Sequence, residues 1–335
     1  MGDLLTIENG QNHKKYIFDG MENSFRYGIC SMQGWRDTME DSVIAETCLG
    51  PDQNTHIFGV FDGHGGREIS NFITNHFVEE FLKNPNYMKG DIKTCLKETF
   101  INLDNKLNSL SAMREMTKDH KSFLKEYNLK EELNLSYAKD LNGNFYIEDL
   151  GYEKGSTGLI CVIHNGIIYF ANAGDSRGIL IRKDKKFLVL TNDHKPINIT
   201  EKQRIKKAGC KIIEGRVNGQ LDLSRGFGDF RFKLRKDLKP EQQAITVCPE
   251  IKMINRDSKD LFIILACDGV WDCVSNEKIS QFFYEKVIDD RDKNLSNIIA
   301  DLFNRIVADS PMKEKGTDNM TCILLQFKKN NNLRK

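Results

Sequence analysis

The chain has 335 residues, of which 39% are hydrophobic and 29% are charged. Lysine and arginine (49) nearly balance aspartate and glutamate (48), so bulk charge gives no reason to expect a nucleic-acid partner. The nine cysteines form no CxxC pair, which argues against a disulfide framework and favours a reduced, cytoplasmic setting. The apolar runs are too short to span a bilayer.

The first six residues, Met1–Thr6, match the pattern for N-myristoylation of Gly2. A single myristoyl chain binds membranes only weakly, and no second anchor lies near it. The sequence therefore predicts a transient membrane contact at most, and an unmodified terminus is the alternative. We expect a cytoplasmic protein that can also reach membranes or the nucleus.

Apolar residues recur at helical spacing over residues 69–81, 92–107 and 295–306. Strands are predicted at residues 27–31, 42–46, 56–61, 158–163, 166–172, 179–182, 187–191, 261–267 and 320–327. The Asn165-Gly166 pair is a strong hairpin signal and makes its two flanking strands antiparallel. Because strands cluster in hairpins, we predict an α+β fold with antiparallel sheets covered by helices.

Two stretches interrupt this pattern. Residues 111–154 are crowded with Lys, Glu, Asp and Asn, and we interpret them as a charged surface insertion, with a dedicated binding element as the alternative. A helix is expected after Asn198. The last residues, 329–335, are rich in Asn and Lys and predict a disordered basic tail.

Acidic residues recur where apolar strands begin or end. Asp62, Asp175 and Asp268 follow strands, whereas Asp41 and Asp318 stand just before them. In an antiparallel sheet the end of one strand lies beside the start of its neighbour. A lone aspartate at such a place is usually a turn former, but five placed so consistently indicate a shared site.

Carboxylates gathered in this way need a cation. Two of them about 5 Å apart repel by about 3 kcal/mol at an effective dielectric constant near 20. The ligands would all be oxygen atoms, which favours Mg²⁺ or Mn²⁺ over Zn²⁺. A carboxylate shared by two such ions would hold them roughly 3.5–4 Å apart, as in two-metal phosphoester chemistry.

Eight motifs, in order along the chain, then carry a specific resemblance. They are Gly34–Arg36 with Met39–Ser42, Phe61–Gly66, Gly155–Thr157, Asn172–Arg177, Asp193–Pro196, Ser224–Asp229, Ala266–Asp272 and Asp318–Thr321. The ordered set resembles the metal-dependent protein phosphatases (PPM, or type 2C, Ser/Thr phosphatases). The resemblance implies a central β-sandwich of two antiparallel sheets flanked by helices. It also implies a catalytic domain over residues 25–328, after an N-terminal segment of residues 1–24, with a flap at about 193–223.

The resemblance also implies roles for single residues. Asp62 bridges two metal ions, and the carbonyl of Gly63 binds one of them. The other implied metal ligands are Asp268 and Asp318 for the second ion, Glu40 and Asp41 through water, and Asp175 for a weaker third ion near Asp272. The cofactors would be two Mg²⁺ or Mn²⁺ ions per subunit, with that third ion more weakly held.

Two further residues complete the implied site. Arg36 would clamp the substrate phosphate, because its guanidinium is planar and always charged. His64 would be the general acid that protonates the departing Ser or Thr oxygen. His76 and His194 are interpreted as structural.

The predicted activity is hydrolysis of phosphoserine and phosphothreonine in protein substrates by a metal-activated water, in a monomer. The alternative is a catalytically silent scaffold that binds phosphoproteins. A silent member would be expected to lose metal carboxylates, whereas this chain keeps Asp62, Asp268 and Asp318.

Overall fold

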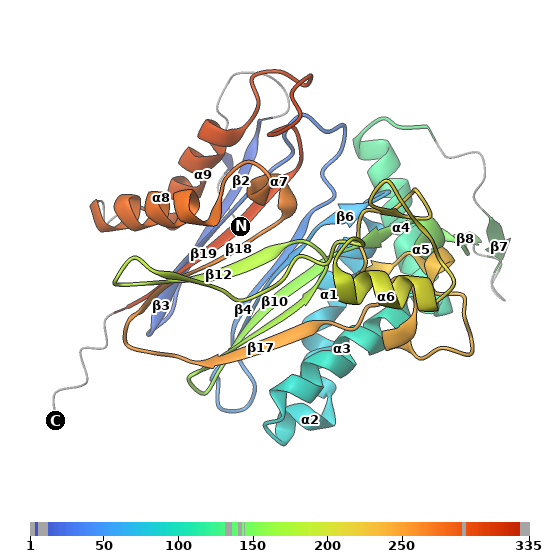
Figure 1. Ribbon diagram of the computed structural model, residues 1–335, viewed down its shortest axis with the longest axis horizontal. Coiled ribbons are helices and arrows are strands. Elements are labelled where there is room, and N and C mark those ends of the chain that lie inside the picture. The colour runs from blue at the N-terminus through green and yellow to red at the C-terminus, as the bar shows by residue number, and fades with distance from the viewer. Residues whose placement is uncertain are drawn as a thin grey trace.

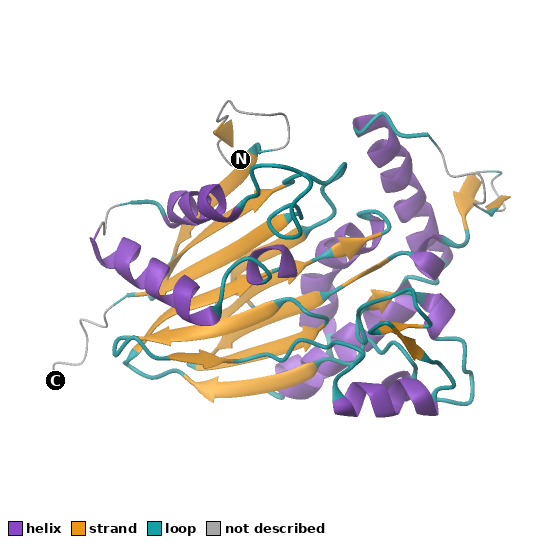
Figure 2. Ribbon diagram, turned by 45° about the horizontal axis from the view of Figure 1, so that its top comes forward, coloured by secondary structure: helices purple, strands orange, loops and turns teal. Residues whose placement is uncertain are grey.

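Two antiparallel sheets stack at the centre of the protein (Figures 1 and 2). The computed structural model describes residues 4–5, 13–130, 136–139, 143, 145–289 and 293–328. A seven-stranded sheet has the order β1-β2-β3-β19-β18-β12-β13, and a five-stranded sheet has the order β17-β11-β10-β5-β4. Helices cover the outer face of each sheet, so the predicted α+β sandwich is confirmed.

The strands that the sequence predicts are all present, with ends shifted by at most three residues. The seven-stranded sheet contains β1 (Leu4–Leu5), β2 (Lys15–Met21), β3 (Phe25–Met32), β12 (Arg177–Arg182), β13 (Phe187–Val189), β18 (Asp260–Ala266) and β19 (Met320–Phe327). The five-stranded sheet contains β4 (Ser42–Leu49), β5 (Thr55–Phe61), β10 (Gly158–His164), β11 (Ile167–Ala173) and β17 (Glu250–Asn255). The predicted Asn165-Gly166 turn joins β10 to β11, and both residues have positive φ (48° and 77°).

Alternation along the strands divides the core into two layers. In β10, Leu159 and Cys161 face the core between the sheets, whereas Ile160 and Val162 face the helices beneath the five-stranded sheet. This period of two is what an extended backbone imposes on side-chain direction. Both faces of the strand are therefore buried, which explains its nearly continuous apolar sequence.

Most of the longer helices pack on the outer faces of the two sheets, and α6 (Ile199–Lys207) belongs to the flap. Apart from α6, the helices are α1 (Glu68–Lys83), α2 (Pro85–Met88), α3 (Ile92–Lys106), α4 (Leu110–Glu126), α5 (Leu150–Glu153), α7 (Asp268–Trp271), α8 (Asn276–Asp289) and α9 (Leu295–Ile306), with 3-10 turns at Phe230–Phe232 and Pro240–Gln242. Helices α1 and α3 pack on the five-stranded sheet, and α8 and α9 pack on the seven-stranded sheet. In the described part of the chain, no helix combines the length and the apolar character that crossing a membrane requires.

Three small sheets complete the fold. They are β6 (Gly63–His64) with β9 (Gly155–Ser156) and β16 (Phe227–Gly228), then β7 (Tyr137–Lys139) with β8 (Phe145–Ile147), and β14 (Ile212–Ile213) with β15 (Arg216–Val217). The first of these holds the Phe61–Gly66 motif against the Gly155–Thr157 motif. Its residues Gly63 and His64 line a cleft at one end of the sheets.

The N-terminal boundary differs from the prediction. Strand β2 pairs with β3 along its whole length, from Lys15 to Met21, so the sheet starts ahead of the predicted domain boundary at residue 25. The sequence signal is weak because much of β2 is solvent-exposed. Gly2 and the predicted tail at residues 329–335 lie outside the described residues.

The structure of residues 111–154 also differs from the predicted surface insertion. Its first part is the helix α4, which packs against α1 and buries Met116, His120 and Phe123. Ser109 caps the helix by accepting a hydrogen bond from the Ala112 amide at 3.2 Å. The buried face includes a histidine and a threonine, so it does not register as an apolar stripe.

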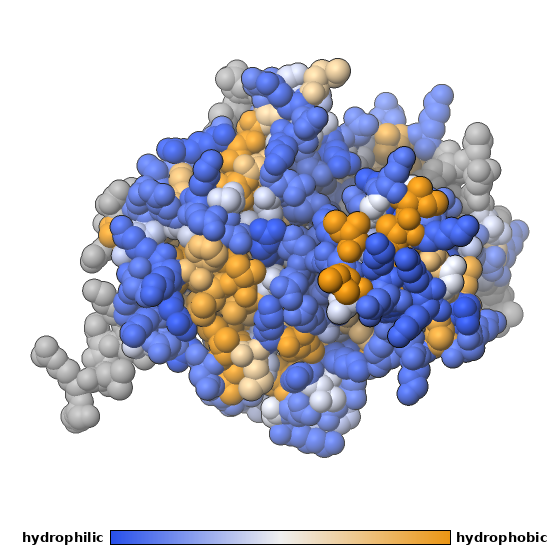
Figure 3. All heavy atoms as spheres, viewed as in Figure 1, coloured by the Kyte–Doolittle hydropathy of each residue, from blue (hydrophilic) through white to orange (hydrophobic). Residues whose placement is uncertain are grey.

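The flap has a small core of its own. Ile205, Val217 and Leu221 pack with Phe232 and Ile245, so this unit extends well past the predicted end at residue 223. Its outer surface is partly apolar, because Ile197, Ile199 and Ile213 are exposed. Figure 3 shows hydrophobic surface in this part of the molecule, around α6.

Candidate active site

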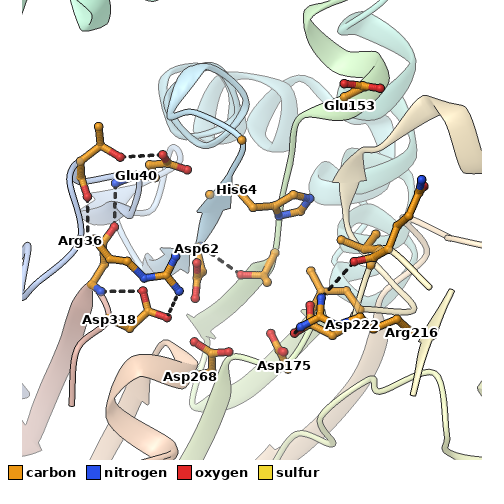
Figure 4. Close-up of a pocket in the computed structure, with 18 of the residues that line it drawn as sticks. Arg36, Glu40, Asp62, His64, Glu153, Asp175, Arg216, Asp222, Asp268 and Asp318 are labelled. Atoms are coloured by element: carbon orange, nitrogen blue, oxygen red, sulfur yellow. Dashed lines mark hydrogen bonds and ion pairs between the residues drawn. The ribbon is translucent and has the colours of Figure 1, made fainter. Parts of the chain in front are cut away.

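An acidic cleft of about 630 Å³ opens at one end of the two sheets. Asp62, Asp175, Asp268 and Asp318 line it together with Arg36 and His64, as Figure 4 shows. The four aspartates come from four different strand ends, which lie far apart in the sequence. The structure therefore brings together the carboxylates that their strand-end positions predict to be neighbours.

Strand register explains how the first pair meets. Ser42 at the start of β4 pairs with Phe61 at the end of β5, so Asp41 and Asp62 emerge side by side. Their carboxylates lie within 4.8 Å of each other and of the Cys267 sulfur. Asp62 is further held by Thr157, whose hydroxyl accepts from the Asp62 amide at 3.0 Å.

Burial and mutual repulsion disfavour ionisation of these acids. Burial, reinforced by the charges of Asp41 and Asp268, raises the pKa of Asp62 well above its usual value. Burial likewise raises the pKa of Asp41 to about 7 and the pKa of Asp268 to about 8. Without a bound cation, burial and mutual repulsion therefore keep part of the cluster protonated near neutral pH.

The donor atoms fit a hard divalent cation. Both carboxylate oxygens of Asp41 are buried, and among the described residues no hydrogen bond of normal geometry reaches either one. Cys267 is an unsuitable ligand, because burial raises the pKa of its thiol well above the usual range and its sulfur already bonds the Asn319 carbonyl at 3.4 Å. The remaining donors are oxygens, the ligand set that Mg²⁺ and Mn²⁺ prefer.

Asp175 is set apart from the other carboxylates by a partner of its own. The ammonium of Lys195 donates a hydrogen bond to it. Burial raises the pKa of Asp175, and the charge of Lys195 opposes that effect. A cation at this carboxylate would have to compete with Lys195, whereas a cation at Asp41 or Asp62 would meet no such ammonium.

Arg36 lies at the mouth of the cleft. Its guanidinium contacts Asp318 at 2.7 Å, and 61% of its side chain is exposed to solvent. Asp318 is held in turn by the Asn319 amide, which donates to it at 2.8 Å. Arg36 can therefore reach a ligand entering from solvent while one side stays anchored to the acidic cluster.

Glu40 and Gly63 occupy the adjoining wall. The Glu40 carboxylate accepts hydrogen bonds from the Thr38 hydroxyl at 2.7 Å and the Gly66 amide at 2.9 Å. Glu40 thus lies in the cleft lining but is already hydrogen-bonded on both oxygens, which suits a contact through water better than a direct metal bond. Asp272 also lines the cleft.

Sequence reasoning missed Asp229, the partner of His64. Nε2 of His64 lies 2.9 Å from Oδ2 of Asp229, which is fully buried. The contact needs Gly155 beside it, because a Cβ there would lie 2.3 Å from the Asp229 oxygen. The signal was present, since Asp229 closes the Ser224–Asp229 motif, but the motif itself shows no role for it.

Asp229 favours the protonated form of His64. Burial acts to lower the pKa of the imidazole, but the opposing charge and hydrogen bond of Asp229 outweigh it and raise the pKa above its usual value. Nε2 donates to Asp229, because a carboxylate can only accept. Nδ1 is then the nitrogen left for proton transfer.

The remaining histidines of interest do not line the cleft. His76 pairs with Glu115 of α4 at 2.8 Å. His194 is buried, with Nδ1 3.0 Å from the Gly174 carbonyl and Nε2 3.4 Å from Glu250. Both positions match the structural interpretation.

Metal binding should stabilise the protein more as pH rises. In the metal-free fold Asp41 and Asp268 hold protons that the unfolded chain releases near pH 4, so their contribution to stability falls as pH rises from about 4 to about 8. A bound cation favours the ionised form and removes this loss. We expect the difference in Tm between Mg²⁺ and EDTA to grow from pH 5 to pH 8. Thermal unfolding followed by fluorescence measures it, and a difference that is constant or shrinks contradicts the site.

Comparisons with known proteins agree with this fold and cleft. The family described as protein phosphatase 2C matches residues 25–122 and 112–313. "Probable protein phosphatase 2C 60" of Arabidopsis thaliana is 36% identical over 324 residues, 94% of this chain and 89% of the relative. "Probable protein phosphatase 2C 6" of Paramecium tetraurelia is 36% identical over 315 residues, 94% of this chain and 97% of the relative.

The solved structures support the fold. A crystal structure of a phosphatase from a pathogenic strain of Toxoplasma gondii superposes with a TM-score of 0.69 at 23% identity, covering 94% of this chain and 96% of that one. The sandwich and its oxygen-lined cleft define a metal-dependent phosphatase. The chain belongs to the protein phosphatase 2C family, whose members are metal-dependent serine/threonine protein phosphatases.

Proposed function

We propose that this protein hydrolyses phosphoserine and phosphothreonine in protein substrates, as a monomer, with two Mg²⁺ or Mn²⁺ ions in the acidic cleft. The observation that carries the proposal is the set of converging, buried carboxylates at the strand ends, flanked by Arg36 and His64. Asp62 would contact both ions, with the Gly63 carbonyl on one side and Asp268 and Asp318 on the other. Bound divalent cations would lower the pKa of water and offset the negative charge of the substrate.

Two weaker contacts complete the proposed metal environment. Glu40 and Asp41 would act through water, and Asp175 would support a third ion beside Asp272. The Lys195 contact supports the weaker affinity of that third position, because the ammonium already neutralises Asp175. The raised pKa values of Asp62 and Asp268 support the need for cations at the first two.

The residues around the cations have separate tasks. Arg36 would bind the phosphate oxygens at the mouth of the cleft, where its side chain contacts Asp318 but is largely exposed to solvent. His64 would hold a proton at Nδ1 and transfer it to the departing serine or threonine oxygen. Asp229 supports this role because its charge and hydrogen bond raise the pKa of the imidazole and so favour its protonated form.

A phosphopeptide assay tests the proposal directly. With Mn²⁺ or Mg²⁺, the purified protein should release phosphate from a phosphothreonine peptide, and EDTA should abolish the release until metal is restored. Release should stop because, without cations, nothing lowers the pKa of the attacking water or offsets the negative charge of the substrate. If metal-replete protein bound phosphopeptides but released no phosphate, the enzyme assignment would be wrong and the scaffold alternative would be favoured.

A further inference from the structure

A buried cluster of three ionisable side chains lies behind the loop that carries His64. Glu68, at the start of α1, accepts hydrogen bonds from Nδ1 of His120 on α4 and, at 3.2 Å, from the ammonium of Lys154. Glu68 and His120 are fully buried and Lys154 is 5% exposed. Burial acts to raise the pKa of Glu68, but these two partners outweigh it and lower the pKa below its usual value.

The cluster touches the His64 loop on its far side. A Cβ at Gly66 would lie 2.2 Å from the Glu68 carboxylate and 2.9 Å from the Lys154 ammonium. The backbone after His64 therefore rests directly on this ion pair. Since Gly66 also donates to Glu40, its position is fixed between the cluster and the wall of the cleft.

Lys154 connects the cluster to the partner of His64 as well. Its carbonyl accepts a hydrogen bond from the Asp229 amide at 3.0 Å. The next residue, Gly155, pairs directly with His64 in the small sheet of β6 and β9. A shift of Lys154 would therefore displace both the backbone beside His64 and the carboxylate that holds its imidazole.

Helix α4 is held to the same region by further contacts. Arg67, which precedes Glu68, binds Asp119 at 3.3 Å and Glu126 at 2.6 Å, both on α4. Just beyond the helix, the Tyr127 hydroxyl accepts from the Met39 amide at 3.1 Å, in the loop between Arg36 and Asp41. The helix thus contacts both loops that line this side of the cleft.

Energetics argue that the cluster is more than a packing device. An ion pair removed from water costs desolvation free energy, and well-packed apolar side chains are often at least as stabilising. A hydrogen-bonded ionic cluster also restricts the relative orientation of its members, because its hydrogen bonds form in only one geometry.

We propose that His120, Glu68 and Lys154 are positioning residues, through which α4 sets the placement of His64 for proton transfer. The inference rests on the proposed role of His64. It assigns a function to the part of the chain that the sequence marked only as a charged insertion.

The dependence of the rate on the leaving group distinguishes a role in positioning His64 from a role in protein stability alone. A phosphothreonine peptide needs its leaving oxygen protonated, whereas the nitrophenolate of p-nitrophenyl phosphate leaves without a proton. We expect His120→Leu to lower kcat about tenfold on the peptide and about twofold or less on p-nitrophenyl phosphate, with KM unchanged. His120→Asn, which keeps a donor near the Nδ1 position, should restore most of the loss. Lys154→Met, which keeps the apolar stem, should behave like His120→Leu.

The controls distinguish the possible failures. His76→Gln removes another α1–α4 histidine–carboxylate pair, which lies further along α1 than Glu68, and should leave both rates unchanged. Folded fraction by circular dichroism and Mn²⁺ affinity by calorimetry accompany each rate. Equal losses on both substrates, or no loss, in folded His120 and Lys154 variants would overturn the positioning role. If His64→Gln itself showed no leaving-group dependence, the proposed function of His64 would be the part that fails.

Discussion

Replacing Asp62 with asparagine should abolish phosphatase activity while leaving the protein folded. Asparagine matches the shape of aspartate but removes the charge at the centre of the acidic cluster, where Asp41, Asp268, Asp175 and Asp318 all raise the pKa of Asp62. Loss of one well-placed electrostatic group already costs about 10²–10³ in rate, and Asp62 is proposed to contact both cations. We therefore expect kcat on a phosphothreonine peptide to fall by about 10³-fold or more.

The same substitution should have the opposite effect on metal-free stability. Removing one of several crowded acids relieves repulsion and the cost of burying a charge. In EDTA at pH 8, the Asp62→Asn variant should unfold at a higher temperature than the wild-type protein, and added Mg²⁺ should raise its Tm less. Asp184→Asn, on the exposed β12–β13 turn, is the matched control and should change neither property. Near-normal turnover by Asp62→Asn would exclude the bridging role.

Replacing His64 with glutamine should have the second-largest effect, and it should depend on the substrate. General acid catalysis contributes about 10²–10⁴-fold when the leaving group is a poor one. We expect kcat on a phosphothreonine peptide to fall about 10²-fold, while the rate on p-nitrophenyl phosphate changes little. The imidazole contacts Asp229 rather than the carboxylates of the cluster.

Metal affinity is the decisive companion measurement for His64. Because glutamine removes an imidazole that is not among the proposed ligands, calorimetric binding of Mn²⁺ should be nearly unchanged. A variant that no longer bound Mn²⁺ would show that His64 belongs to the metal site and does not act as the acid.

Much of the site could be predicted because its residues follow strand ends. Asp62, Asp268 and Asp318 flank strands with strong apolar patterns, and antiparallel pairing then dictates that their ends meet. The partner of His64 could not be predicted in this way. Asp229 reaches His64 through a loop whose path depends on β16, a two-residue strand with no sequence pattern of its own.

The elements that escaped prediction share a physical cause. Strands β2 and β17 lie near or at sheet edges, so only part of each is buried and the apolar alternation is weak. Helix α4 escaped because its buried face carries His120 and Thr117, which find their partners only after folding. The apolar periodicity of a sequence predicts which face of an element is buried. The prediction fails where an element is only partly buried, or where its buried face carries polar side chains that find partners elsewhere in the fold.

By itself, the sequence determined the antiparallel sheets covered by helices, the convergence of the acidic strand ends and the preference for an oxygen-bound cation. These depend on hydrophobic periodicity and on residue chemistry, which are local properties. Only the tertiary structure decided that Lys195 neutralises Asp175, that Asp229 holds His64, and that α4 lies behind the catalytic loop. Those contacts join residues from 20 to 165 positions apart, and their geometry exists only when the packed core has brought the elements together.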